Sequence, residues 1–362
     1  MSTLELSLLT LAAFGATAVG TGWLRRWLIK RSIIDHPGEE GGRYIHEVPT
    51  PRGGGLAIYA VLVAAWATIM TKSPNTPIGT GWILVCSVGL AIPAWIDDLG
   101  IVNSVRGHVN GDAVVHFPDV RAIHTRDFFV LLQLFWQVVI ASIGTFFLTG
   151  PLPIFQGLLP TALDTSATVF LWVGFINLFN FTDGIDGNAG TKAVVLGVGI
   201  FALSIFGEFP SGLGELGIIT AAIALGFLVW NWYPARIFMG DIGSIPLGFL
   251  LGWLLLSLAG RGQWAPALIL PLIYLSDSGL TYMAKITRGE KFWRGHRDLF
   301  YQRAAHCTEA THADIVKVIL LGDIVLLGLA IFATQGMIAL SLIGAIATSA
   351  AVIAYLRFGF RQ

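Results

Sequence analysis

Charged side chains are scarce in this 362-residue sequence, and the scarcity excludes most soluble folds. Asp, Glu, Lys and Arg make up 12% of the residues, whereas hydrophobic residues make up 55% and the mean hydropathy is +0.73. Soluble domains carry about a quarter charged residues, and a soluble core of this size could not bury so much apolar sequence. The net charge is zero, so no overall field favours nucleic acid as a partner. The composition predicts an integral membrane protein.

Cysteine is nearly absent as well. Cys86 lies in an apolar run and Cys307 in a polar segment, which gives neither a metal-binding spacing nor a disulfide framework. The first apolar run, residues 4–24, lacks a basic leader and a clear cleavage site. We therefore expect it to be a retained helix rather than a signal peptide.

Long apolar runs recur along the whole chain, and a helix needs about 20 apolar residues to span the hydrocarbon. The candidate spans are residues 4–24, 56–70, 82–96, 128–148, 165–178, 191–206, 216–232, 245–258, 265–283, 315–333 and 338–356. No long soluble segment interrupts them. The sequence therefore predicts an all-α, polytopic membrane protein with about 11 transmembrane helices in a single domain, 1–362.

Basic residues in the connecting segments predict the orientation, since Lys and Arg concentrate on the cytoplasmic side. With the N-terminus outside, only Lys72 and Arg261 of the 22 basic residues lie outside. The reverse orientation would place nearly all the basic charge on the translocated side. We therefore predict a cytoplasmic C-terminus and cytoplasmic segments near 25–55, 97–127, 179–190, 233–244 and 284–314.

The predicted cytoplasmic segments also carry most of the reactive side chains, whereas the outside segments carry mainly Pro, Gly and Thr. The five polar clusters are residues 46–55, Asp97-Asp98, residues 177–187, residues 238–241 and His296-Arg297. They come from distant parts of the sequence and share one predicted face. A simple membrane anchor has no need of such a gathering.

Acidic residues occupy equivalent positions in three of these clusters. Asp97 and Asp98 directly follow an apolar run, where a pair in isolation is as readily a solvated helix end as a ligand set. However, Asp183, Asp186 and Asp241 occur in the same topological place, beside glycines that let backbone approach a ligand closely. Carboxylates at a membrane surface suit Mg²⁺, which takes oxygen ligands and keeps substrate phosphates and water.

His296 and Arg297 belong to the basic stretch 291–303 and allow two interpretations. The first is an anchor that contacts anionic lipid head groups. The second is a phosphate clamp, since Arg binds phosphate in a bidentate fork. An acidic metal site beside a basic clamp is suited to a pyrophosphate, because phosphoryl transfer depends on positioning and charge neutralisation.

Together the clusters resemble the bacterial polyprenyl-phosphate N-acetylhexosamine-1-phosphate transferases of glycosyltransferase family 4, in the branch that initiates O-antigen and teichoic-acid synthesis. The similarity extends in order from about Asp35 to Arg303. It is carried by Pro49-Thr50-Pro51-Arg52-Gly53-Gly54-Gly55, Asp97-Asp98, Asn-x-x-Asn-x-x-Asp-Gly-x-Asp-Gly at 177–187, Asn231, Phe238-Met239-Gly240-Asp241-Ile242-Gly243-Ser244, His296-Arg297 and Tyr301-Gln302-Arg303.

The resemblance implies a reaction and its participants. A polyprenyl (undecaprenyl) phosphate would attack the β-phosphate of a UDP-sugar at the cytoplasmic face of the inner (plasma) membrane, releasing UMP. The product would be polyprenyl-diphosphate-sugar, which initiates cell-envelope polysaccharide synthesis. The implied cofactor is Mg²⁺, with Mn²⁺ as an alternative. The implied partners are the UDP-sugar, the lipid phosphate and the bilayer; a homodimer is left open.

The resemblance also implies roles for single residues. Asp241 and Asn180 would hold the metal. Phe238 would stack on the uracil, and the other substrate-binding residues would be Arg52, Asn177, Asp186 and Asn231. The catalytic centre would consist of Asp97, Asp98, Asp183, His296 and Arg297. Asp97 or Asp98 would act either as a base or in positioning, because a phosphate monoester is already mostly dianionic at neutral pH.

Two positions depart from the family pattern. A second His is expected three residues after His296, where this sequence has Leu299. The segment 99–127 is longer than expected and offers Arg106 or Arg126 as the basic residue that follows the Asp pair. Its histidines, His108, His116 and His124, suggest solvated loop residues more than a metal site.

Two questions stay open, the role of Asp277 and the function of the chain as a whole. Asp277 falls inside a predicted span, where a carboxylate is either functional or a capped structural group near a helix end. The chain as a whole could instead be a transporter that uses clustered carboxylates, or a scaffold for polysaccharide assembly. The position of the acids at span ends rather than at mid-membrane favours the transferase.

Overall fold

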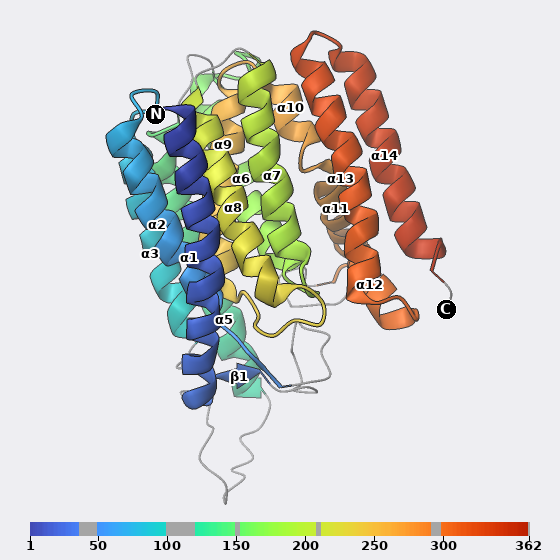
Figure 1. The fold of residues 1–362 in the computed structure, drawn as a ribbon. Helices are drawn as coiled ribbons and strands as arrows, with labels where there is room; N and C mark the ends of the chain where they lie inside the picture. Colours follow the sequence, from blue (N-terminus) through green and yellow to red (C-terminus); the bar gives the residue numbers. More distant parts are fainter. Residues whose placement is uncertain (36–48, 99–119, 149–152, 208–210, 291–297, 361–362) are drawn as a thin grey trace, which may run out of the picture.

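A computed structural model describes residues 1–35, 49–98, 120–148, 153–207, 211–290 and 298–360, and it is almost entirely helical (Figure 1). The elements are α1 (Thr3–Lys30), β1 (Ile34–Asp35), β2 (Thr50–Pro51), α2 (Gly55–Lys72), α3 (Thr80–Asp98), α5 (Val120–Thr145), α6 (Thr161–Thr182), α7 (Asn188–Phe206), α8 (Ser211–Asn231), α9 (Asp241–Ala259), α10 (Trp264–Ile269), α11 (Leu272–Thr287), α12 (Phe300–Cys307), α13 (His312–Thr334) and α14 (Ile338–Phe358). The predicted all-α membrane class is confirmed.

Within the described residues, nine helices are long and apolar enough to cross a bilayer. Two further predicted spans differ in form. The apolar part of α5 within the described residues is the shorter stretch Val130–Thr145. The run 265–283 is divided into α10 and α11 at Pro271, which has no backbone N–H with which to continue a helix. The predicted total of about 11 spans stays a prediction.

Helix α9 lies at the centre of the bundle, and 94% of its apolar window is buried. It packs on α6 and α3, and more lightly on α2, α7 and α10. Trp172 on α6 stacks on Phe249 with ring centroids 4.6 Å apart, and its indole N–H donates to the Phe249 carbonyl over 2.9 Å. Glycines on neighbouring helices make room for this ring, because a Cβ on Gly144 or Gly252 would meet it at 2.7–2.8 Å.

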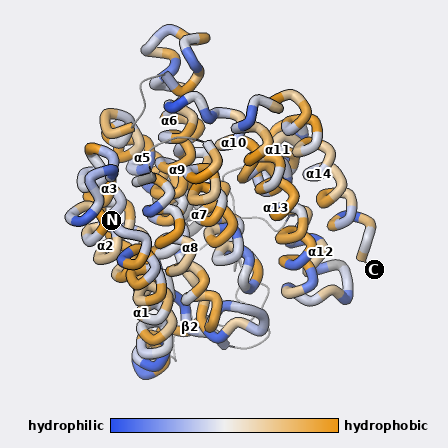
Figure 2. Tube along the Cα trace, turned by 45° about the horizontal axis from the view of Figure 1, so that its top comes forward, coloured by the Kyte–Doolittle hydropathy of each residue, from blue (hydrophilic) through white to orange (hydrophobic). Residues whose placement is uncertain are grey.

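The polar clusters meet at one end of this bundle. Hydrophobic residues dominate the helices, and hydrophilic residues gather towards their ends (Figure 2). The two chain ends lie at opposite ends of the bundle (Figure 1). The start of α9 and the end of α3 lie near the end that carries β1 and the C-terminus. The candidate site is therefore at the mouth of the apolar bundle rather than in its middle.

Candidate active site at the mouth of the helical bundle

The main chain after β2 pairs with the loop that precedes α9. The Phe238 N–H donates to the Pro51 carbonyl over 2.8 Å, and the Gly54 N–H donates to the Phe238 carbonyl over 2.8 Å. Arg52 and Phe238 thereby form a parallel bridge. Two of the predicted clusters, from distant parts of the sequence, are thus held in register by backbone hydrogen bonds.

The helices that follow these two loops, α2 and α9, begin side by side. A Cβ on Gly55 would overlap the backbone N and Cα of Gly243, and one on Gly243 would lie 2.6 Å from the Gly55 Cα. Glycine at both positions allows this close approach. The N-terminal ends of two helices therefore meet at the site, and helix N-termini favour negatively charged groups.

Asp98, at the end of α3, caps the first turn of α9. The N-cap residue of α9 is Gly240, which has no side chain to satisfy the first N–H groups. Asp98 accepts them instead, from Asp241 over 3.2 Å and from Ile242 over 2.9 Å. Gly240 has φ +75°, and a Cβ there would lie 2.5 Å from Oδ2 of Asp98. The glycine is required both by its conformation and by the closeness of the carboxylate.

Arg52 joins the two acids that flank this turn. Its Nε lies 3.0 Å from Oδ1 of Asp98, and its Nη2 donates to Oδ1 of Asp241 over 3.4 Å. The Asp98 and Asp241 side chains are 0% and 3% exposed, whereas that of Arg52 is 27% exposed. Buried carboxylates require a compensating positive charge. Arg52 supplies one here while part of its side chain still faces solvent.

Asp183 and Asn180, at the end of α6, reach the same turn. Oδ2 of Asp183 accepts the Gly240 N–H over 3.3 Å. The carboxamide oxygen of Asn180 accepts the Ser244 hydroxyl over 2.7 Å. Ser244 lies three residues after Asp241, so the two side chains project from nearly the same face of α9. Asn180, Asp183 and Asp241 are therefore assembled around one helix start.

Asp186 and Asn231 form a second connection nearby. The Ala235 N–H donates to Oδ2 of Asp186 over 2.9 Å, and the Gly187 N–H donates to Oδ1 of Asn231 over 3.1 Å. Both side chains are buried. They hold the turn before α7 against the loop after α8. The resemblance implies that both bind substrate, and the structure shows them at one junction.

The expected roles of three further residues, Asp97, Phe238 and Asn177, stay predictions. Asp97 is partly exposed. Phe238 is only 2% exposed, so its expected stacking role stays a prediction. Asn177 donates to Gln137 of α5 over 2.5 Å and to the Val173 carbonyl over 2.8 Å, which turns its amide towards a neighbouring helix.

Other predicted residues lie outside the described part of the chain. These are His296, Arg297, and residues 99–119, which include Arg106, His108 and His116. The side chains of His124 and Arg126 also fall outside the description.

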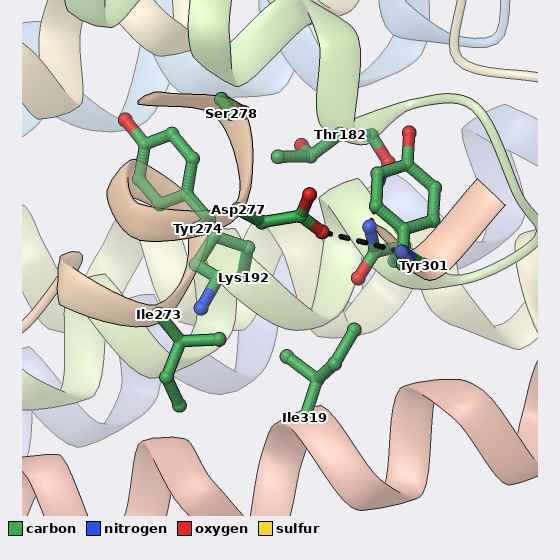
Figure 3. Close-up of a pocket in the computed structure, with 9 residues that line it drawn as sticks. Thr182, Lys192, Ile273, Tyr274, Asp277, Ser278, Tyr301 and Ile319 are labelled. Carbon is green, nitrogen blue, oxygen red and sulfur yellow. Dashed lines mark hydrogen bonds between the residues drawn. The ribbon is translucent and has the colours of Figure 1, made fainter. Parts of the chain in front are cut away.

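Asp277 takes the structural alternative. Its carboxylate accepts the N–H groups of Phe300 over 2.8 Å and Tyr301 over 3.3 Å, and so caps α12. The N-cap residue of α12, Leu299, makes no such bond. Asp277 lies in a small pocket and points across it to the start of α12 (Figure 3). The first residues described after the segment that holds Arg297 are therefore anchored to α11.

Tyr301 connects α12 to the acidic turn. Its hydroxyl donates to the Phe181 carbonyl, two residues before Asp183. A Cβ on Gly184 would contact both the Tyr301 hydroxyl and the Gln302 amide nitrogen. The α12 helix and the turn at 183–184 therefore fit together closely.

Leu299, where a second His was expected, is 1% exposed and packs in the hydrophobic core. A core position explains an apolar residue there. No phosphate-facing replacement for a second His has to be sought at this position.

Three contacting residues had no role assigned to them from the sequence, although Ser244 belongs to the 238–244 motif. The first is Ser244, which the i, i+3 spacing from Asp241 could have revealed. The second is His312, whose Nδ1 lies 3.4 Å from Oδ2 of Asp186 and whose ring contacts Tyr233. The third, Asp323, is paired with Lys192 inside the bundle. The contacts of His312 and Asp323 join distant helices, and no local pattern signals them.

The donor chemistry of the site fits a hard divalent cation. Asp241 offers carboxylate oxygens and Asn180 a carboxamide oxygen, oriented by Ser244. Such oxygen donors suit Mg²⁺, which is usually bound by few protein ligands together with phosphates and water. Across the described residues, no three His, Cys, Asp or Glu side chains form a ready metal cluster. The metal role of these two residues stays a prediction.

The fold and the site define a polytopic membrane protein with a charged, phosphate-compatible cluster at one end of its bundle. Residues 80–259 match the sequence pattern described as glycosyl transferase family 4. The matched segment includes α3, α6 and α9, and with them Asp98, Asn180, Asp183 and Asp241.

Curated relatives are similar over a larger part of the chain. The decaprenyl-phosphate N-acetylglucosaminephosphotransferase of Mycolicibacterium smegmatis is 29% identical over 267 residues, 68% of this chain and 59% of the relative. The phospho-N-acetylmuramoyl-pentapeptide-transferase of Thermodesulfovibrio yellowstonii is 31% identical, over 63% of this chain and 64% of the relative. A probable undecaprenyl-phosphate N-acetylglucosaminyl 1-phosphate transferase of Bacillus subtilis is 28% identical, over 70% and 63%.

The chain spans less than two thirds of the length of these relatives. Their identities to this chain are similar even though their names describe different transferred groups. The comparisons therefore support a family rather than one sugar substrate.

Proposed function

We propose that this chain transfers a sugar-1-phosphate from a UDP-N-acetylhexosamine to a polyprenyl phosphate such as undecaprenyl phosphate, at the cytoplasmic face of the plasma membrane. The observation that carries the proposal is the contact of Arg52 with both Asp98 and Asp241. It assembles one basic and two acidic side chains at the mouth of an apolar bundle. The phosphate of a membrane lipid lies at the surface of the bilayer, level with this end of the bundle. A nucleotide sugar can reach the same place from water. The names of the relatives support the same class of reaction.

In the proposed reaction, an oxygen of the lipid phosphate bonds to the β-phosphorus of the donor. The bond from that phosphorus to the oxygen shared with the α-phosphate breaks, and UMP leaves with the oxygen and its electron pair. Asp241 and Asn180 would hold Mg²⁺, which supplies charge neutralisation at the transferring phosphate.

The remaining side chains would position the reactants. Arg52 lies beside Asp241 and would bind a phosphate oxygen through its guanidinium fork. The carboxylate of Asp98 already accepts two backbone N–H groups and pairs with Arg52. We therefore give Asp98 a positioning role and leave the question of a base to the partly exposed Asp97.

The proposal is tested with purified chain in nanodiscs that contain undecaprenyl phosphate. UDP-N-acetylglucosamine, UDP-N-acetylfucosamine and UDP-N-acetylquinovosamine are supplied in turn, with Mg²⁺ or with a chelator. We expect UMP release and a lipid-diphosphate-sugar, detected by mass spectrometry, with at least one donor and only with the metal. Folded protein that forms no lipid product with any donor would refute the proposal. Solute flux in sealed vesicles without UMP release would support the transporter instead.

A further inference from the structure

The main chain on both sides of Arg52 is held by hydrogen bonds to Phe238. Pro51 before Arg52 accepts the Phe238 N–H, and Gly54 after Arg52 donates to the Phe238 carbonyl, each over 2.8 Å. The backbone therefore cannot move far when the guanidinium changes partner. Any rearrangement of Arg52 has to occur along its own flexible side chain.

The two contacts of the guanidinium are unequal. The distance to Asp98 is 3.0 Å, and Asp98 is itself fixed by the N–H groups of Asp241 and Ile242. The distance to Asp241 is 3.4 Å, and that carboxylate begins α9. The contact to Asp241 is the longer of the two, and the Arg52 side chain is 27% exposed. We therefore expect the contact to Asp241 to break before the contact to Asp98.

Asp241 is also the residue that a divalent cation would need. A guanidinium and a metal ion provide the same compensating charge to a buried carboxylate, and they repel one another at close range. Their repulsion therefore disfavours simultaneous binding of the two to Asp241. The observed arrangement therefore places an internal cation on the predicted metal ligand.

We propose that Arg52 is a built-in competitor of the divalent metal. Without metal it neutralises Asp98 and Asp241; when metal binds, it keeps Asp98, releases Asp241 and turns its freed nitrogen to a phosphate oxygen of the donor. This inference rests on the proposed function, because it takes Asp241 as a metal ligand and a nucleoside diphosphate as the donor.

The competition makes metal and nucleotide bind cooperatively. Metal alone must displace Arg52, which then lacks its second acidic partner. A diphosphate supplies a new partner for the freed guanidinium, so each ligand increases the affinity for the other by the same factor. Removal of the positive charge should strengthen the binding of metal alone and reduce the cooperativity to the part that comes from direct contact of metal with phosphate.

The test measures Mn²⁺ binding by electron paramagnetic resonance on the full chain in detergent, with and without UDP. Without nucleotide, we expect Arg52→Gln to bind Mn²⁺ about tenfold more tightly than the unchanged chain. With UDP, the affinity of the unchanged chain should rise about tenfold more than that of Arg52→Gln, in which only the direct contact of metal with phosphate remains. Arg52→Lys keeps the charge without the fork and should bind with intermediate affinity. Arg357→Gln is the matched control, since that guanidinium lies over the Phe358 ring on α14, away from the site, and it should bind like the unchanged chain.

A second substitution identifies the site that is measured. Asp241→Asn should remove Mn²⁺ binding in both the Arg52 and the Arg52→Gln backgrounds. If Arg52→Gln binds Mn²⁺ equally or more weakly while its melting temperature is unchanged, Arg52 is no competitor. If Arg52→Gln does not fold, the Arg52→Lys result decides: affinity equal to or below that of the unchanged chain overturns the inference.

The binding measurement requires neither lipid nor turnover. Absence of lipid product with the expected Mn²⁺ behaviour would refute the proposed function alone. Product formation together with an unaltered Mn²⁺ affinity of Arg52→Gln would refute this inference alone.

Discussion

Asp98 is the last residue of α3, yet its carboxylate caps α9, the helix that begins 143 positions later at Asp241. The acid that follows Asp97 in the sequence is therefore part of the scaffold of the turn that begins α9. Asp98 and Asp241 both contact Arg52 but are expected to have different roles. Substitutions at the two positions should therefore affect stability and activity differently.

Asp98→Ala should destabilise the protein. It leaves the N–H groups of Asp241 and Ile242 without their acceptor, and each unsatisfied buried donor costs about 1–3 kcal/mol. We expect a lower melting temperature in detergent and lost activity. The control is Glu309→Gln, an exposed acid, which should change neither. A stable Asp98→Ala protein would show that the cap is dispensable.

Asp241→Asn should have the opposite pattern. The amide keeps the shape of the side chain but removes the charge that a metal requires. We expect UMP release to fall by about two orders of magnitude or more, with the melting temperature nearly unchanged. Near-normal release from the folded variant would remove the metal role of Asp241.

Tyr301→Phe tests the connection between α12 and the acidic turn. The ring is kept, but the hydrogen bond to the Phe181 carbonyl is lost, at a cost of about 1 kcal/mol. If the loss of this hydrogen bond raises the activation free energy by the same amount, kcat should fall about fivefold. Steady-state kinetics should show a smaller change in KM. Tyr355→Phe on the exposed side of α14 is the control and should behave as the unchanged chain.

Lys192 and Asp323 form a buried ion pair between α7 and α13, at 2.6 Å, with side chains 1% and 0% exposed. Lys192→Met should lower the free energy of unfolding by about 3–5 kcal/mol, because a buried carboxylate loses its partner. The double variant Lys192→Met, Asp323→Leu should recover most of that stability. Lys72→Met, which removes the exposed contact to Glu5, should leave the melting temperature unchanged. Failure of the double variant to recover stability would show that the pair itself is required.

The predicted orientation can be tested by cysteine labelling. In a Cys86→Ala, Cys307→Ala background, Asn75→Cys should react with an impermeant thiol reagent in intact cells. Glu309→Cys, in an exposed segment beside α13, should react only after lysis. Reversed labelling would place the site on the other side of the membrane and overturn access to cytoplasmic nucleotide sugars.

The sequence predicted much of the site, because membrane topology places distant loops on one face. Residues 49–55, Asp98 and residues 238–241 were expected to share that face, and they are in contact. Their motifs are local, so single positions could be read directly. The helical class followed in the same way from the apolar runs.

Long-range packing was the part that the sequence could not supply. Asp277 could equally have been functional, and only its contact with the start of α12 decides for a cap. The sequence showed only that Leu299 stands where a second His was expected, whereas its burial predicts that Leu299→His would destabilise the protein, since a polar ring would enter the core. The break at Pro271 is different: its signal was present in the sequence and was outweighed by the surrounding apolar run.

The contact between Gly55 and Gly243 affects how mutational tolerance in this protein has to be interpreted. A saturation mutagenesis library scored by cell growth would show both glycines to be as intolerant as Asp241, although neither carries a reactive group. Their intolerance would come from two helix starts that have no room for a side chain. Sensitivity to substitution around this site therefore reports both close helix packing and the reaction itself. Measurements of stability and activity on isolated protein are needed to separate the two.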